Sequence, residues 1–431
     1  MAEQHEKALV PQIRFTGFTD PWEQRKLGEL ASKRIEKNTN GIKETFTNSA
    51  EHGVVSQLDY FDHDITNDAN IGNYSVVHPD DFIYNPRISA VAPCGPINRN
   101  KLDRNGVMSP LYTVFSVDDT IDKLYLEHYF KTSRWHQFMF LEGNSGARSD
   151  RFSISDSIFF EMPIQCPVLE EQELIASFFG RLDSLITLHQ RKYDKLCVLK
   201  KSMLDKMFPK GGSLYPEIRF AGFTDPWEQR KLEDYVVVST AKNVDGRFNK
   251  EDVLSVSGEY GIVNQIAFQG RSFAGSSVLN YGIVNTGDIV YTKSPLNSNP
   301  YGIIKVNKGI PGIVSTLYAV YRPQDNVHTN FIQVYFEQHE RMNNYMHPLV
   351  NKGAKNDMKV TAENALKGVV TFPSREEQVI ISEFFDRLDS LITLHQRKYD
   401  GCANPLFLER RISCRKPSHQ NRCSATTTPS G

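Results

Sequence analysis

Hydrophobic residues recur every seven positions through one long stretch of the chain, as they do in a coiled coil. Pro167 and Glu170 stand at its start, and Pro209 followed by two glycines stands at its end. The pattern predicts one helix from about Glu170 to Phe208, roughly 58 Å long at 1.5 Å per residue. Its two seam positions hold Ile175, Leu182, His189, Leu196 and Met203, and Phe178, Leu185, Lys192, Leu199 and Lys206.

Part of this helix occurs twice in the chain. Residues 178–194 return as residues 384–400 with one change, Gly180 to Asp386. The segment 11–27, which contains Trp22, returns as 216–232 with two changes. An offset of about 206 residues is far longer than the roughly 20 to 50 residues of a solenoid unit, so it indicates a duplicated domain. We expect both tryptophans, Trp22 and Trp227, to be packing anchors.

Between these repeated segments, the central parts of the two halves are only loosely alike in sequence. The first half has short β-favouring runs at 81–84 and 111–115 and a helical pattern at 124–140. Corresponding patterns occur in the second half at 288–291, 312–321 and 331–346. The sequence therefore predicts an α+β protein with two pseudo-twofold-related globular α/β domains, separated by long helices that pack as an antiparallel coiled coil. The expected parts are domain 1 at 11–165, helix 1 at 166–212, domain 2 at 213–372, a shortened helix 2 at 373–400, and an aberrant tail at 401–431 that we expect to be disordered.

The second helix should end early. After Asp400 the repeat is lost, and Gly401 and Pro405 are both residues that disfavour a helix. The seam residue His189 is expected to make a hydrogen bond at a helix interface, because this is a commoner role for such a histidine than ligand or base.

Composition excludes several classes of protein. The net charge is −1, so the whole molecule has no basic signature, although a local basic surface remains possible. The six cysteines include no CxxC pair, and the polar first residues and the lack of a long apolar run predict a cytoplasmic protein. The Walker-like segment 270–277 lacks the lysine that must reach the phosphates, and no GxSxG, HExxH or GxGxxG motif with strand–helix context appears. We therefore expect a protein that is not an enzyme and that binds no metal.

Binding through polar loops in the central part of each half is the function that remains. Arginine, asparagine and lysine are the side chains that read base edges and hold phosphates. The candidate DNA-binding residues are Asn85, Arg87, Arg99, Lys101, Arg148 and Arg151 in the first half, and Lys293, Asn297, Asn299, Lys352, Lys355 and Lys359 in the second.

The repeated motifs resemble those of the specificity subunits of type I restriction–modification systems. They are Phe-Thr-Asp-Pro-Trp-Glu-Gln-Arg-Lys-Leu at 18–27 and 223–232, Glu-Glu-Gln at 170–172 and 376–378, and Phe-Phe-x-Arg-Leu-Asp-Ser-Leu-Ile at 178–186 and 384–392. The resemblance covers residues 11 to 400. It implies two target recognition domains that each read half of a bipartite asymmetric DNA site.

The resemblance also implies partners. Two methyltransferase (modification) subunits would dock on the repeat helices, through which restriction subunits would join, and S-adenosylmethionine, ATP and Mg would be bound by those partners and not by this chain. The residues expected on the docking and spacer helices are Phe178, Leu182, Leu185, Ile186, Phe384, Leu388, Leu391 and Ile392. Two alternatives remain: a structural coiled-coil adaptor that does not read DNA, and a defective specificity subunit.

Overall fold

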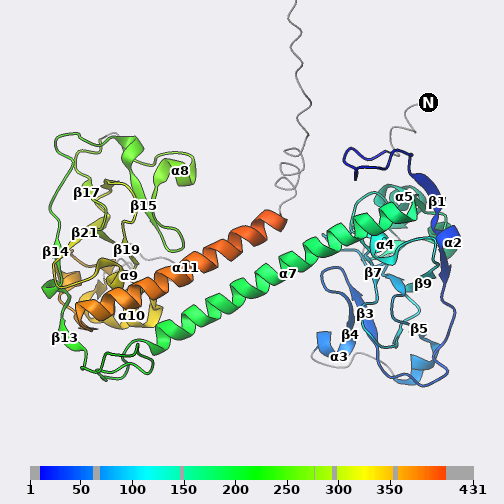
Figure 1. The fold of residues 1–431 in the computed structure, drawn as a ribbon, viewed down its shortest axis with the longest axis horizontal. Helices are drawn as coiled ribbons and strands as arrows, with labels where there is room; N and C mark the ends of the chain where they lie inside the picture. Colours follow the sequence, from blue (N-terminus) through cyan, green and yellow to red (C-terminus); the bar gives the residue numbers. More distant parts are fainter. Residues whose placement is uncertain are drawn as a thin grey trace, which may run out of the picture. The chain divides into compact units, whose positions relative to one another are not determined.

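The computed structural model describes residues 10–61, 68–145, 150–275, 277–293, 299–352 and 358–403, and it divides into two compact units, Met1–Leu185 (unit 1) and Ile186–Gly431 (unit 2) (Figure 1). The predicted α+β class is confirmed, because each unit combines an antiparallel sheet with packed helices. Within the described residues, no helix is long and apolar enough to cross a membrane.

Unit 1 is built around a four-stranded antiparallel sheet in the order β2-β9-β6-β7. All three residues of β6 are buried because both faces of the sheet are covered: Phe82 and Tyr84 join the core beside α4, and Ile83 joins a second cluster with Phe46. The elements are β1 (Glu23–Lys26), α2 (Leu27–Leu30), β2 (Ala31–Lys33), β3 (Phe46–Ser49), β4 (Gly53–Ser56), α3 (Gln57–Tyr60), η1 (Asp68–Asn73), β5 (Ser75–Val77), β6 (Phe82–Tyr84), β7 (Ile97–Arg99), β8 (Gly106–Met108), β9 (Thr113–Val117), α4 (Lys123–Phe130), α5 (His136–Glu142), β10 (Asn144–Ser145), β11 (Phe152–Ser153), α6 (Asp156–Phe159) and β12 (Pro163–Cys166). The long helix α7 (Leu169–Lys206) begins in unit 1 and continues into unit 2.

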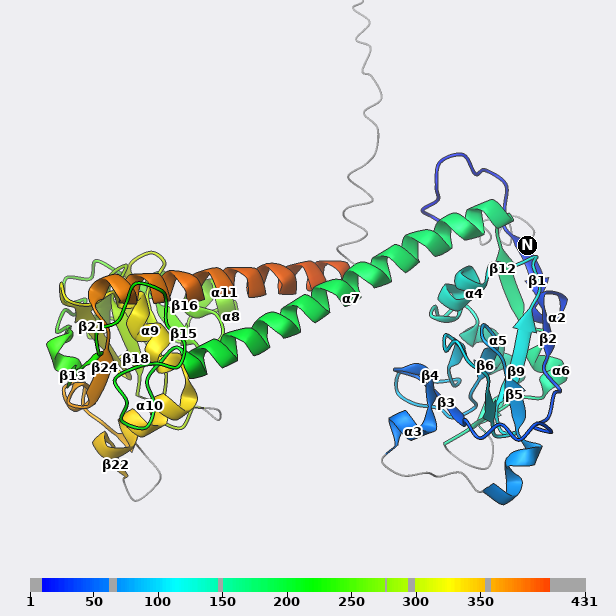
Figure 2. The same cartoon turned by 60° about the horizontal axis from the view of Figure 1, so that its bottom comes forward.

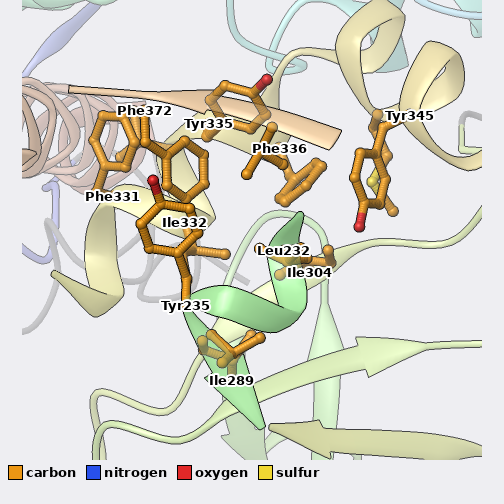
Figure 3. Close-up of a cluster of buried hydrophobic side chains, with 14 of the residues drawn as sticks. Leu232, Tyr235, Ile289, Ile304, Phe331, Ile332, Tyr335, Phe336, Tyr345 and Phe372 are labelled. Atoms are coloured by element: carbon orange, nitrogen blue, oxygen red, sulfur yellow. The ribbon is translucent and has the colours of Figure 1, made fainter. Parts of the chain in front are cut away.

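Unit 2 repeats this plan with its sheet in the order β14-β21-β18-β19. Its main core gathers aromatic rings from α9, α10 and β24 over Ile289 and Ile304 of the sheet (Figure 3). The elements are β13 (Glu228–Lys231), η2 (Leu232–Asp234), β14 (Val236–Val238), η3 (Lys250–Asp252), β15 (Leu254–Ser257), β16 (Gly261–Asn264), α8 (Gln265–Gln269), β17 (Gly282–Val284), β18 (Ile289–Thr292), β19 (Ile304–Val306), β20 (Gly312–Val314), β21 (Tyr318–Pro323), α9 (Thr329–Glu337), α10 (His339–Met346), η4 (His347–Leu349), β22 (Asn351–Lys352), β23 (Met358–Lys359), η5 (Asn364–Leu366), β24 (Val369–Phe372) and α11 (Arg375–Ala403).

The single helix expected at 124–140 was wrong, because the structure has two, α4 and α5. The hydroxyl of Thr132 donates to the carbonyl of Tyr129, and the indole of Trp135 donates to the carbonyl of Phe130. These side chains occupy carbonyls that a continuing helix would use, so the chain turns. The stretch expected at 331–346 is likewise divided into α9 and α10.

The long helix is confirmed within two residues at each end, as α7 covers Leu169–Lys206. Helix α11 runs to Ala403 and so passes through Gly401, which we expected to stop it. One glycine inside a helix costs about 1 kcal/mol, which neighbouring residues can offset. The tail from residue 404 onward lies outside the described residues.

The repeated segments at the two ends of each domain meet in a buried ion pair. Arg14 donates from Nε and Nη2 to both carboxylate oxygens of Glu171, at 2.8 and 2.7 Å. Arg219 binds Glu377 in the same way and at the same distances. Both carboxylates are fully buried. Trp22 and Trp227 are also buried, which confirms them as packing residues.

We expect Arg219→Ala to destabilise unit 2 by about 3–5 kcal/mol, because Glu377 would remain buried without its cation. Hydrogen exchange of peptides from unit 2 would measure the loss. The control is Arg230→Ala, which removes an exposed pair with Glu228 and should change stability by less than about 0.5 kcal/mol. Equal protection in both variants would contradict the assigned role of the buried pair.

Candidate nucleic-acid interface and docking helices

Within unit 2, the later part of α7 lies beside α11 in antiparallel orientation (Figures 1 and 2). Lys200 donates to Asp389 at 2.6 Å and to Glu337 of α9 at 2.7 Å. Burial opposes the charge of Lys200, but the two carboxylates outweigh it and raise its pKa. The lysine therefore ties α7 to both neighbouring helices.

Equivalent histidines of the two repeats meet between these helices. Nδ1 of His189 lies 3.0 Å from Nδ1 of His395, which confirms the predicted interface hydrogen bond. Contact between equivalent residues is what a local twofold axis between antiparallel helices produces. Since one Nδ1 must accept the proton that the other donates, the contact requires at least one neutral ring.

The expected docking residues fall into two environments. In unit 2, Leu388 is buried and Phe384 packs against the core, while Leu391 is 44% exposed and Ile392 is half-buried. In α7, Phe178 and Leu185 are 39% and 47% exposed, and Leu182 and Ile186 are half-buried.

Sequence reasoning missed the deepest anchors of the helix pair. Leu204, Met207, Phe208 and Phe385 are all buried in unit 2. The repeated Phe-Phe pair was not a sufficient signal, because Phe385 is buried while its counterpart Phe179 is 41% exposed.

Three first-half candidates are engaged within unit 1. Asn85 is buried; its Nδ2 donates to the carbonyl of Asn48, and its Oδ1 accepts from the backbone N–H of Arg87. Arg99 and Lys101 both bind the buried carboxylate of Glu127, at 3.0 and 2.5 Å. Burial opposes ionisation of Glu127, yet the two cations keep its pKa below the usual value.

The structure brings Arg87 and Arg151 together. Their backbones form an antiparallel bridge, with Arg87 exposed and Arg151 half-buried beside Asp150. Two arginines on neighbouring backbone segments are suited to phosphate or guanine contacts. Arg148, in the same region of the sequence, lies outside the described residues.

In unit 2, Lys293 is half-buried just after β18, and Asn299 is half-buried before β19. The backbones of Lys352 and Lys359 lie in the paired strands β22 and β23. Asn297 and Lys355 lie outside the described residues. The strands β10 and β11 of unit 1 pair in the same manner, so the two Gly-Ala segments of the sequence join corresponding strand pairs.

Unit 2 also contains a cavity of about 970 Å³ between the helix pair, β19, α9, α10 and the turn after β15. Lys305 on its wall is 8% exposed, and burial lowers its pKa. Glu337 offers a buried oxygen without a hydrogen-bond partner. Among the described residues, no group of three or more His, Cys, Asp or Glu side chains could hold a metal ion. The cavity therefore offers polar binding groups.

Residues 19–197 match the family model described as the type I restriction modification DNA specificity domain. The first half of the chain is therefore similar to the DNA specificity domain of type I restriction–modification systems. The duplication places a second copy of the matched motifs in unit 2, including Trp227 and Phe385.

One solved S subunit shares the fold of the chain. The type I S subunit from M. genitalium is similar at a TM-score of 0.55 and 12% identity, over 95% of this chain and all of that one. The HsdS subunit from Thermoanaerobacter tengcongensis has a TM-score of 0.39 and 15% sequence identity, over 93% of this chain and 97% of that one. A chain from a structure described as the structural basis of complex assembly and conformational transition of the type I R-M system has a TM-score of 0.42 and 14% sequence identity. The match covers 92% of this chain and 97% of that one.

We expect the pairing of α7 with α11 to weaken as the pH falls through about 6.5, the usual pKa of a histidine. Burial, helped by the nearby His189, Lys192 and Lys398, lowers the pKa of His395 in the folded state. The unfolded chain then binds the proton more readily, so stability is full above this pH and falls below it.

Hydrogen exchange of α11 between pH 7 and 5, corrected for the intrinsic rate, would measure the change. His395→Gln should flatten the dependence, and His347→Gln, outside the pair, should leave it intact. A pH dependence that survives His395→Gln would contradict the role of the pair.

Proposed function

We propose that the chain is the subunit that reads a bipartite, asymmetric DNA site and docks two modification subunits. The proposal rests on one observation: the two units share the same buried ion pair and sheet order, which we call the frame, but carry different polar surfaces. Arg14–Glu171 and Arg219–Glu377 have the same geometry, and the two sheets have the same strand order. The domains differ where polar loops extend from this frame: unit 1 presents Arg87 beside Arg151, and unit 2 presents Lys293 and Asn299.

Two different surfaces on equivalent frames would read two different half-sites. Base contacts from loops would supply sequence preference, and lysines and arginines would hold the phosphate backbone. The chain would perform no catalysis. Methyl transfer from S-adenosylmethionine would belong to the modification subunits, and ATP- and Mg-dependent cleavage to the restriction subunits. The complex would act in the cytoplasm.

Equivalent exposed leucines support two docking surfaces. Leu185 and Leu188 on α7 are 47% and 46% exposed, and their counterparts Leu391 and Leu394 on α11 are both 44% exposed. Large apolar side chains left open at matching places on two helices fit two copies of one partner.

The DNA proposal is tested by selecting from a random duplex pool with the subunit bound to its modification subunits. Recovery of a split motif is expected. Replacing residues 11–165 by the first domain of another specificity subunit should change one half of the motif only. Failure to retain any duplex, with assembly intact, would favour the coiled-coil adaptor instead.

We expect the double variant Leu391→Glu with Leu394→Glu to bind one modification subunit in place of two, because it charges one docking surface only. Native mass spectrometry would count the subunits. The control is Val198→Glu, since Val198 is 70% exposed on α7 and is not one of the paired leucines. Retention of both partners by the double variant would remove α11 as a docking surface.

We expect Arg87→Ala to weaken DNA binding by about 1–3 kcal/mol and to relax preference in one half-site only. Arg87 is exposed, so folding should be unaffected. Arg104→Ala is a matched control because Arg104 is exposed and pairs with Glu44. Equal DNA affinity and an equal motif for Arg87→Ala and wild type would exclude Arg87 from the interface.

A further inference from the structure

The last turn of α7 and the two residues that follow it complete the core of unit 2. Leu204, Met207 and Phe208 are 8%, 3% and 1% exposed. The ring of Phe208 lies 5.8 Å from Trp227 and 6.3 Å from Phe385 of α11. Phe385 is consequently fully buried. The end of α7 thus acts as a cap over the first turns of α11.

Arg341 closes the other side of this cap. Its guanidinium stacks on Phe208 at 4.3 Å and donates to the backbone carbonyl of Leu204 at 3.1 Å. Burial lowers the pKa of Arg341 to about 10. Asp205 accepts a hydrogen bond from Gln338. The cap is therefore fixed by apolar and polar contacts together.

Unit 1 carries the same helix surface without a cap. Phe179, the counterpart of Phe385, is 41% exposed, and Leu182 is half-buried where its counterpart Leu388 is 6% exposed. Nε2 of His128 is buried without a hydrogen-bond partner, and its ring lies 5.4 Å from Phe179. In the part of the chain that the structure describes, no segment covers this surface as Phe208 covers Phe385.

The sequence explains the difference. Adding the repeat offset of 206 to Lys200, Leu204, Met207 and Phe208 leads to Leu406, Arg410, Ser413 and Cys414. The Leu-x-x-Met-Phe pattern of the cap is not repeated there. The helix surface with Phe179 or Phe385 therefore occurs in both units, while the segment 204–208 that packs on it occurs in the chain once.

We propose that the face of unit 1 around Phe179 and Leu182 is a docking site for an amphipathic helix supplied by a second polypeptide. That helix carries Leu, Met and Phe at the spacing of Leu204, Met207 and Phe208. A second copy of this chain is a poorer donor, because its own segment is already buried in its unit 2. The occupant is therefore the end of a repeat helix from another chain of this family.

Charge separates this site from the one in unit 2. Lys131 stands at the repeat position of Glu337 and binds Asp183, the counterpart of Asp389, at 3.0 Å. In unit 2 the same aspartate is bound by Lys200 of the cap. Unit 1 thus supplies its own cation, so helix binding there should depend on the phenylalanine and little on the lysine.

The test uses the full chain and a fluorescent peptide of residues 195–210 with C197S. Saturable 1:1 binding by anisotropy is expected. F208A in the peptide should weaken binding at least about tenfold, and K200A should change it less than about threefold. A peptide that instead displaced the chain's own cap in unit 2 would need Lys200 as well as Phe208. Equal losses of affinity for the F208A and K200A peptides would therefore overturn the site in unit 1.

A change in the chain provides the second arm. Phe179→Ala should weaken binding about as much as F208A, and because the ring is 41% exposed the fold should survive. Leu174→Ala is the matched control: its counterpart Ile380 stays 39% exposed although unit 2 has its cap, so this position lies outside the footprint. No saturable binding, or equal binding to both variants, would refute the proposal. Neither result depends on DNA reading.

Discussion

The fold of each unit depends on how its long helix begins. Glu171 and Glu377 are buried in the first turns of α7 and α11, where a carboxylate favours the helix dipole but needs a cation when water is excluded. Arg14 and Arg219 supply that cation from segments 157 and 158 residues earlier. One bidentate pair therefore closes each domain and joins its entry to its exit.

The glutamine that follows extends this junction. The side-chain oxygen of Gln172 accepts from the backbone N–H of Asp122 just before α4, and its nitrogen donates to the carbonyl of Pro167. Gln378 does the same with His328 and Pro373. Because these groups are buried and mutually satisfied, any substitution would leave unpaired polar atoms. This explains in physical terms why the second glutamate and the glutamine of Glu-Glu-Gln occur unchanged in both repeats.

Much of this architecture was readable because it is periodic or repeated. Heptad spacing located α7, and the duplication gave the plan of two equivalent units. The partners of the seam residues were not readable, since the heptad pattern cannot distinguish another helix from a globular core: Leu196 and Met203 pack against the core of unit 2. The polar candidates were harder still. Composition could not show that Glu127 would hold Arg99 and Lys101 while Arg87 stayed exposed.

The one change within the repeated helix segment shows how the two units have diverged. At Gly180 a Cβ atom would lie 3.2 Å from Leu124, so α4 packs close to α7. Asp386, at the same position, binds Lys308 at 2.6 Å and Asn330 at 2.9 Å. Lys101, at a matching place near the sheet edge, binds Glu127 instead. Each unit has adjusted its contacts to the helix locally, while the pair at the start of the helix is the same in both. A frame fixed by a few buried polar residues can thus keep its geometry while the surfaces around it change.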